Sequence, residues 1–140
     1  MRHARYLPAA LFIVFLANSS VASDKQNFDG KWQTTVTCSN FRDALGFSFQ
    51  FLSTVTDGVL HGLHGDEGQP GYLQVEGTIP PDGHAALYAK GRTGSKEFVP
   101  GRDTPRGTDY GYNIDAHFEG ATGTGTRTEG RPCTLKFVKQ

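Results

Sequence analysis

The sequence predicts an all-β fold: one small antiparallel barrel of the up-and-down type, with about seven or eight strands. Apolar and polar residues alternate through most of residues 30–139, which is the period of a half-buried strand. Turn signals rich in glycine, proline and aspartate recur about every 8 to 12 residues. Beyond the N-terminal segment, apolar residues never recur with helical spacing. A β-sandwich is the alternative, because short strands with regular turns fit both architectures.

The first half of the domain predicts three strands in which one face is apolar. The stretch GKWQTTVTC, residues 30–38, alternates as a strand, and the Asp57-Gly58 pair predicts a tight hairpin that returns the chain over residues 59–63. The residues expected on one face are Trp32, Thr34, Val36 and Cys38 in the first strand and Phe47, Phe49 and Phe51 in the second.

The second half predicts four or five further strands separated by strong turns. The sequence PPDG, residues 80–83, is one such turn, and TGTGTRTEG predicts a weak strand of small residues. The residues that share a face are Leu73, Val75 and Ile79, then Ala85, Leu87 and Ala89, then Tyr110, Tyr112, Ile114, Ala116 and Phe118, and finally Cys133, Leu135 and Phe137.

The N-terminal segment predicts export. Two arginines precede the apolar run LPAALFIVFLA and the small-residue segment NSSVAS, an order typical of a secretory signal peptide. Cleavage is expected after Ser23 or after Ala22. The run is shorter than the roughly 20 apolar residues that cross a bilayer, which argues against a membrane anchor. We therefore expect a signal peptide at residues 1–23, one domain at residues 24–140, and a periplasmic or secreted protein.

The two cysteines are expected to form a disulfide. Cys38 ends the first predicted strand and Cys133 begins the last, and paired cysteines in an exported chain most simply bond to each other. Such a bond would bring the first and last strands together, which favours a closed barrel with no exposed strand edge. A reactive or metal-binding thiol pair is the alternative, but the chain has no CxxC spacing.

Charge argues against several classes of partner. The chain carries 14 basic and 14 acidic residues, and removal of the signal peptide would leave the domain slightly acidic. Such a balance is not typical of proteins that bind nucleic acid or anionic membranes. We expect neither partner.

Two histidine arrangements resemble metal sites, but neither predicts one. His61 and His64 would lie on opposite faces of a regular strand. Asp115, His117 and Glu119 share a face, but it is opposite the aromatic face and so faces solvent. We expect no metal and no cofactor. The chain also has no GxSxG nucleophile motif and no phosphate-binding loop, so we expect no enzyme; a metal-dependent enzyme is the least favoured hypothesis.

The connection over residues 91–107 is the first candidate site. It is longer than the roughly 12 to 15 residues beyond which loops are uncommon and often functional. Arg92, Arg102 and Arg106 lie in it with the apolar Phe98, a composition typical of recognition surfaces. We expect this loop to bind a protein partner, and a solvated flexible loop is the alternative.

The barrel interior is the second candidate site. A barrel of about eight strands is either filled by side chains or holds one small ligand. Trp32, Phe49, Tyr110 and Tyr112 would line this interior. The alternative function is therefore a carrier of a small apolar ligand.

Several motifs resemble known families. The residues FDGKW, Phe28 to Trp32, resemble the G-x-W opening of lipocalin-like barrels, in which the tryptophan closes one barrel end. Together with G-x-P-G, PDG, GTG-x-R and the final RPC, they also resemble uncharacterised secreted bacterial all-β domains. That resemblance implies one domain with a disulfide, and no particular activity. The chain is also similar to periplasmic inhibitor barrels, which implies a protein target.

Overall fold

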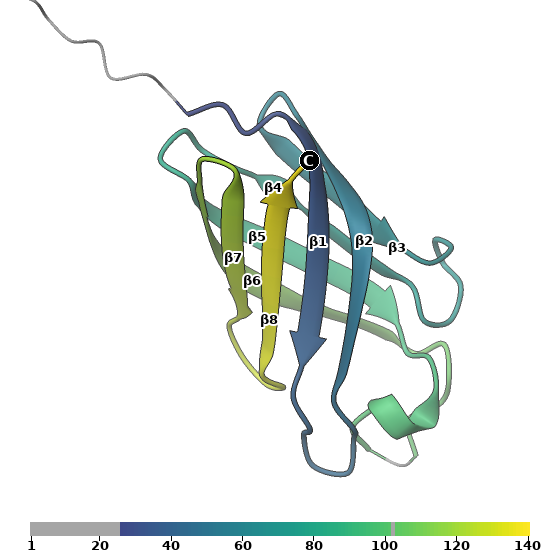
Figure 1. Cartoon of the computed structure of the whole chain (residues 1–140). Helices are drawn as coiled ribbons and strands as arrows, with labels where there is room; N and C mark the ends of the chain where they lie inside the picture. Colours follow the sequence, from purple (N-terminus) through teal and green to yellow (C-terminus); the bar gives the residue numbers. More distant parts are fainter. Residues whose placement is uncertain (1–25, 102) are drawn as a thin grey trace, which may run out of the picture.

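The computed structural model describes residues 26–101 and 103–140, and within them the chain forms a closed antiparallel barrel. Each strand pairs with its neighbours along the chain, and the last pairs with the first (Figure 1). This confirms the all-β barrel and excludes the sandwich. The strands are β1 (Gly30–Cys38), β2 (Phe47–Thr56), β3 (Val59–His64), β4 (Leu73–Thr78), β5 (His84–Arg92), β6 (Asp109–Glu119), β7 (Thr122–Arg127) and β8 (Cys133–Lys139).

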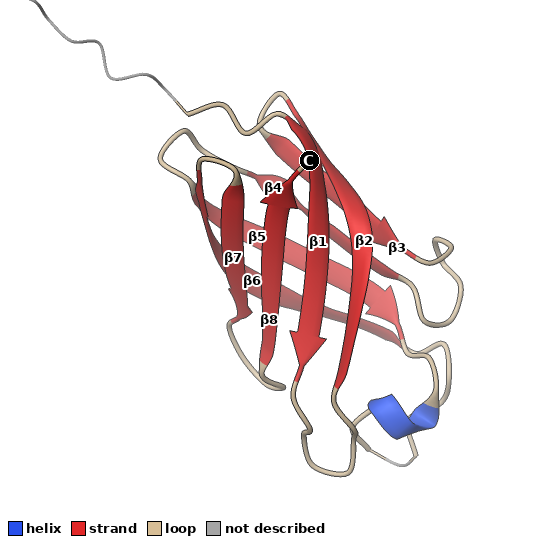
Figure 2. Ribbon diagram, viewed as in Figure 1, coloured by secondary structure: helices blue, strands red, loops and turns tan. Residues whose placement is uncertain are grey.

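Figure 2 shows that strands make the barrel wall and that a short helix lies outside it. This helix, η1 (Lys96–Phe98), sits in the connection between β5 and β6. Among the described residues, no helix has the length and apolar character needed to span a bilayer. The expected signal peptide at residues 1–23 lies outside the described residues.

Burial alternates along the strands as the sequence predicts. In β6 the side chains of Tyr112, Ile114, Ala116 and Phe118 are buried, and those between them are exposed. The same alternation places Ala85, Leu87 and Ala89 inside β5. Each strand therefore contributes every second residue to one core inside the barrel.

The hairpin between β2 and β3 forms at the predicted Asp57-Gly58 pair. Both residues adopt positive φ, 51° and 77°, as a tight turn of this kind requires. Their backbone N–H groups donate to the two carboxylate oxygens of Asp29, each at 2.9 Å. The Asp29 of the FDGKW motif thus fixes this turn against the start of β1.

One end of the barrel is filled by aromatic side chains. Trp32 is fully buried, and its indole N–H donates to the carbonyl oxygen of Phe28 at 2.8 Å. The Trp32 ring meets that of Phe118 edge-on, with centroids 5.4 Å apart, and Phe118 packs in turn on Phe137. Trp32 and its aromatic neighbours thus fill this end of the barrel, which we call the closed end.

The opposite end, which we call the mouth, carries the long connections. In an up-and-down barrel alternate hairpins lie at the same end. The mouth is therefore formed by residues 39–46, 65–72, 93–101, 103–108 and 128–132 (Figure 1). β2 pairs with β1 along nearly its whole length but with β3 only over Ser53–Thr56. Toward the mouth β2 therefore extends past the end of its pairing with β3, and the wall opens.

The expected disulfide between Cys38 and Cys133 is present. The two residues face each other at the mouth end of the β1–β8 pair, with their Cα atoms 4.1 Å apart. The bond therefore joins the first and last strands where the barrel begins to open.

Candidate functional site

The mouth contains a cavity of about 710 Å³. Most of its aromatic lining comes from two strands, β2 with Phe47 and Phe49, and β6 with Tyr110 and Tyr112. In a closed barrel of eight strands in sequential order, β2 and β6 are four positions apart in both directions and so lie opposite each other. The cavity is thus bounded by aromatic side chains on two opposing walls.

The wall on β2 and β3 is a continuous stack of rings. The rings of Phe47 and Phe49 are nearly parallel, at 10°, with centroids 5.6 Å apart. The His64 ring lies on Phe49 with a centroid distance of 4.1 Å. Burial lowers the pKa of His64 below its ordinary value of 6.5, because the charged imidazolium would lose hydration there. At neutral pH the His64 ring therefore adds no charge to this wall.

The wall on β6 consists of two parallel phenols. The rings of Tyr110 and Tyr112 lie at 8° to each other with centroids 6.4 Å apart. Burial raises the pKa of Tyr112 to about 12, and that of Tyr110 rises for the same reason. Both hydroxyls thus stay protonated and can donate a hydrogen bond.

A small residue on β5 leaves room for the tyrosine wall. Gly91 pairs with Tyr110, and a Cβ there would lie 2.8 Å from the Tyr110 hydroxyl and 2.4 Å from the carbonyl oxygen of Tyr72. A side chain at Gly91 would collide with backbone as well as with the phenol. The glycine is therefore a steric requirement of this wall.

Arg131 ties three segments together at the mouth. Its side chain is buried, and its guanidinium donates to the carbonyl oxygens of Ser39, Leu45 and Phe98. It also lies over the Phe47 ring, 4.8 Å from the centroid. Burial lowers the pKa of Arg131, and the nearby charge of Arg127 lowers it further. This side chain holds the η1 segment against the connection between β1 and β2.

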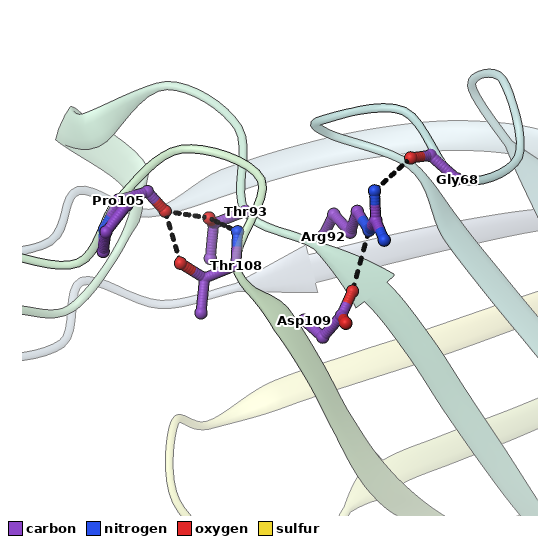
Figure 3. Close-up of polar contacts among 6 residues, drawn as sticks. All are labelled: Gly68, Arg92, Thr93, Pro105, Thr108 and Asp109. Carbon is purple, nitrogen blue, oxygen red and sulfur yellow. Dashed lines mark hydrogen bonds and ion pairs between the residues drawn. The ribbon is translucent and has the colours of Figure 1, made fainter.

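The base of the long loop is fixed by a second set of hydrogen bonds (Figure 3). The Thr93 hydroxyl donates to the carbonyl oxygen of Pro105 at 2.7 Å and accepts from the Thr108 N–H at 2.9 Å. The Thr108 hydroxyl donates to the same carbonyl oxygen at 2.6 Å. The loop over residues 91–107 is therefore anchored at both of its ends rather than freely solvated.

Arg92 is engaged within the fold. Its Nε donates to the Asp109 carboxylate at 2.8 Å, and a terminal nitrogen donates to the Gly68 carbonyl oxygen at 2.8 Å (Figure 3). The Asp109 pair is partly exposed, so its contribution to stability is small. By donating to both Gly68 and Asp109, Arg92 holds the connection between β3 and β4 beside the start of β6.

The structure brings together most of the residues that the two hypotheses named. Phe49, Tyr110, Tyr112, Arg92 and Phe98 all line the cavity, although the sequence assigned them to two separate sites. The expectation that Trp32 lines the same cavity is wrong, because Trp32 lies at the closed end. Arg106 is exposed on the loop and also lies outside the lining, and Arg102 lies outside the described residues.

Sequence reasoning missed Arg127 and Arg131, which both line the cavity. Gly123 and Gly125 face inward on β7, and Arg127 is the next residue in the same alternation. The period of two could therefore have predicted that the Arg127 side chain points into the barrel. Arg131 lies in the connection between β7 and β8, where no periodic signal applies. Only its place in the RPC motif marked it.

The three histidines considered as metal ligands, His61, His64 and His117, do not converge. His64 faces the cavity, whereas His61 lies on the outer face and is 3.8 Å from Glu76. The His117 side chain is also outside, 3.9 Å from Glu119. Within the part of the chain that the structure describes, no group of three or more histidine, cysteine, aspartate or glutamate residues is placed to hold a metal ion.

Comparison with protein-family models, with curated proteins and with solved structures finds no match to this chain. The resemblances carried by the sequence motifs stay predictions.

Proposed function

We propose that the protein is an exported, non-catalytic binding protein that holds one small ligand in the mouth cavity. The observation that carries this proposal is a cavity of about 710 Å³ between aromatic walls on opposite strands. Small-molecule sites are typically concave, of about 300–1,000 Å³, and lined by apolar and aromatic side chains with a few polar groups. The mouth cavity has each of these properties.

The division of the barrel into two halves supports this proposal. The aromatic cluster around Trp32 fills the closed end, where no ligand could enter without unpacking the core. At the mouth the equivalent space is bounded by partly exposed rings, and Tyr110 keeps 39% of its surface exposed. The filled half stabilises the fold, and the open half is left for binding.

The polar groups in the cavity favour binding over catalysis. His64 lines the cavity and, with its lowered pKa, is neutral at pH 7, so it is the candidate for a general base. Its ring, however, stacks on Phe49, and no hydrogen bond joins it to a described hydroxyl or carboxylate. A nucleophilic mechanism needs a base within hydrogen-bond reach of its nucleophile. The two cysteines at the cavity wall are joined as a disulfide and offer no thiol.

Mass spectrometry of the protein, purified gently from the exported fraction of its host, tests this proposal. The native mass should exceed the denatured mass by a small constant amount, and Phe49→Ala should lower the fraction of molecules that show this excess. Leu52→Ala is the matched control, because Leu52 lies on the outer face of the same strand with 49% of its surface exposed. Equal native and denatured masses would overturn the proposal. The denatured mass also locates the signal-peptide cleavage.

A protein partner is the second candidate function, and one observation favours it. Leu45 and Phe98 are exposed by 55% and 37%. Their segments are joined at the rim, where the Leu45 N–H donates to the carbonyl oxygen of Glu97 at 2.7 Å. Apolar side chains beside arginines are typical of interface centres. An inhibitor of an extracytoplasmic hydrolase would use this rim.

The two candidates separate at Leu45, which is on the rim but does not line the cavity. Leu45→Glu should abolish binding of a protein partner and leave a small ligand bound. Loss of the small ligand in Leu45→Glu, with the fold intact by circular dichroism, would contradict this separation of the two surfaces.

A further inference from the structure

We propose that the ligand of the mouth cavity is a flat aromatic anion whose charged group is bound by Arg127. This inference rests on the proposed function and specifies the chemistry of the ligand. The rings of the ligand would lie between the two aromatic walls, and its carboxylate or similar oxygen group would meet the guanidinium.

The charge of the lining supports an anion. Among the described residues, four arginines and one aspartate line the cavity, in a chain whose basic and acidic residues are equal in number. The aspartate, Asp109, is already paired with Arg92. Within the described ranges, 26–101 and 103–140, no carboxylate lies within ion-pair distance of the other three, which are Arg42, Arg127 and Arg131. A ligand that carries a negative charge would be attracted to this end of the barrel.

Of the arginines, Arg127 has donors left for a ligand. Its Nε donates to the carbonyl oxygen of Glu129 at 2.8 Å, and its guanidinium lies over the Tyr112 ring, 4.4 Å from the centroid. Its two terminal nitrogens donate no hydrogen bond to the residues that the structure describes. A guanidinium held in place with free donors is suited to bind a carboxylate through paired hydrogen bonds.

The other arginines are committed or peripheral. Arg131 donates to three carbonyl oxygens, and Arg92 donates to Asp109 and to the Gly68 carbonyl oxygen. Arg42 is exposed on the connection between β1 and β2, with its guanidinium 5.1 Å from the Phe41 centroid. The repulsion between Arg127 and Arg131, which contributes to the lowered pKa of Arg131, would be relieved by an anion beside them.

The shape of the cavity supports a flat aromatic body. One wall presents the parallel rings of Phe47, Phe49 and His64, and the opposite wall presents those of Tyr110 and Tyr112. An aromatic ligand between them can contact rings of both walls, edge-on or offset-stacked. Because the pKa of Tyr112 is raised to about 12, its hydroxyl stays protonated. This hydroxyl belongs to the ring that the Arg127 guanidinium covers, and it is a further donor for an anion.

Two fluorescent probes with the same rings distinguish the contribution of the negative charge to binding from that of the aromatic rings. Anilinonaphthalene sulfonate carries one negative charge, and phenylnaphthylamine is the same ring system without the sulfonate. We expect both to bind the purified protein, and the sulfonate to bind about tenfold more tightly or better, since a hydrogen bond to a charged group is worth about that factor.

Arg127→Met should remove this preference. Methionine can still pack on Tyr112, so the affinity for phenylnaphthylamine should change less than about twofold, while that for the sulfonate falls about tenfold or more. Arg106→Met is the matched control, because Arg106 is an exposed arginine of the neighbouring loop outside the cavity lining. It should leave both affinities unchanged.

The outcomes distinguish the two proposals. If neither probe binds, the proposed function fails and this inference with it. If both bind equally, or if Arg127→Met keeps the preference, the cavity binds ligands but the anion inference is wrong. Should Arg127→Met not fold, a sodium chloride titration of the unaltered protein decides: weaker binding of the sulfonate alone supports the inference, and equal responses overturn it.

Discussion

Cys38 and Cys133 lie opposite each other at the mouth end of the β1–β8 pair, and both line the mouth cavity. The bond between them closes a loop of 95 residues and joins the two strands that complete the barrel. The same covalent bond thus holds the barrel closed and forms part of the wall of its candidate binding site.

Replacing both cysteines by alanine should lower the free energy of unfolding by about 4 to 5 kcal/mol, since an unfolded chain without the 95-residue loop constraint gains that much from entropy. Urea denaturation of the double variant and of the oxidised protein measures the difference. Chemical reduction of the unaltered protein should have the same effect. A loss below about 1 kcal/mol would show that the pairing of β1 with β8 closes the barrel without the bond.

The alternation of apolar residues predicted which face of each strand is buried, but not how far along the barrel each residue lies. Trp32 and Phe49 both point inward, yet β1 pairs Trp32 with Ser53 and Val36 with Phe49. The distance from Trp32 to the disulfide at Cys38 is six residues along the strand, roughly 20 Å. From that spacing one could have predicted that the tryptophan lies far from the end of the barrel that carries the disulfide.

The loop contacts could not be predicted in the same way. The contacts of Arg131 with the carbonyl oxygens of Ser39, Leu45 and Phe98 join segments that are far apart in the sequence. No local pattern encodes such contacts, because they depend on which hairpins share an end of the barrel. Their placement requires the full topology.

Arg131→Met should release the η1 segment from the mouth. Three carbonyl oxygens lose a charged donor, so we expect the free energy of unfolding to fall by about 2 to 4 kcal/mol. Amide hydrogen exchange should accelerate over residues 95–101 more than in the strands. Arg106→Met, an exposed change in the same loop, should alter neither quantity by more than about 0.5 kcal/mol. Unchanged exchange in Arg131→Met would contradict its anchoring role.

The burial of His64 predicts a loss of stability in mild acid. Its pKa in the folded protein lies below 6.5, so just below that pH the unfolded chain binds more protons than the folded one. The stabilisation is therefore complete above about pH 6.5 and declines as the pH falls through the lower folded pKa. His64→Phe should flatten this part of the stability curve. Parallel curves for the two proteins would refute the assignment to His64.

Tyr112 predicts the converse behaviour in alkali. Its pKa of about 12 exceeds the 10.0 of an unfolded tyrosine, so between these values the folded state holds a proton that the unfolded state has lost. The free energy of unfolding should fall as the pH rises through this interval, and that of the Tyr112→Phe variant should fall less. The ultraviolet difference between the two proteins should show the Tyr112 phenol titrating near 12. Titration near 10.0 would show that the phenol is not buried.

Thr34 and Ser53 form a buried hydroxyl pair inside the barrel, with their oxygens 2.7 Å apart and both side chains fully buried. Thr34→Val leaves the Ser53 hydroxyl without this partner, and Ser53→Ala does the same to Thr34. Each single change should cost about 1 to 3 kcal/mol, because a buried hydroxyl that loses its partner keeps its desolvation penalty.

The loss of stability in the double variant should be smaller than the sum of the two single losses by at least about 1 kcal/mol, since no unpaired hydroxyl remains. Denaturation of all four proteins in urea gives this coupling energy. The matched cycle uses Thr37 and Ser48, whose hydroxyls are 3.0 Å apart on the exposed face of the same two strands. Their coupling should be smaller, because water replaces a lost partner there. Equal couplings in the two cycles would mean that water reaches Thr34 and Ser53, and that the barrel is not dry beneath the mouth cavity.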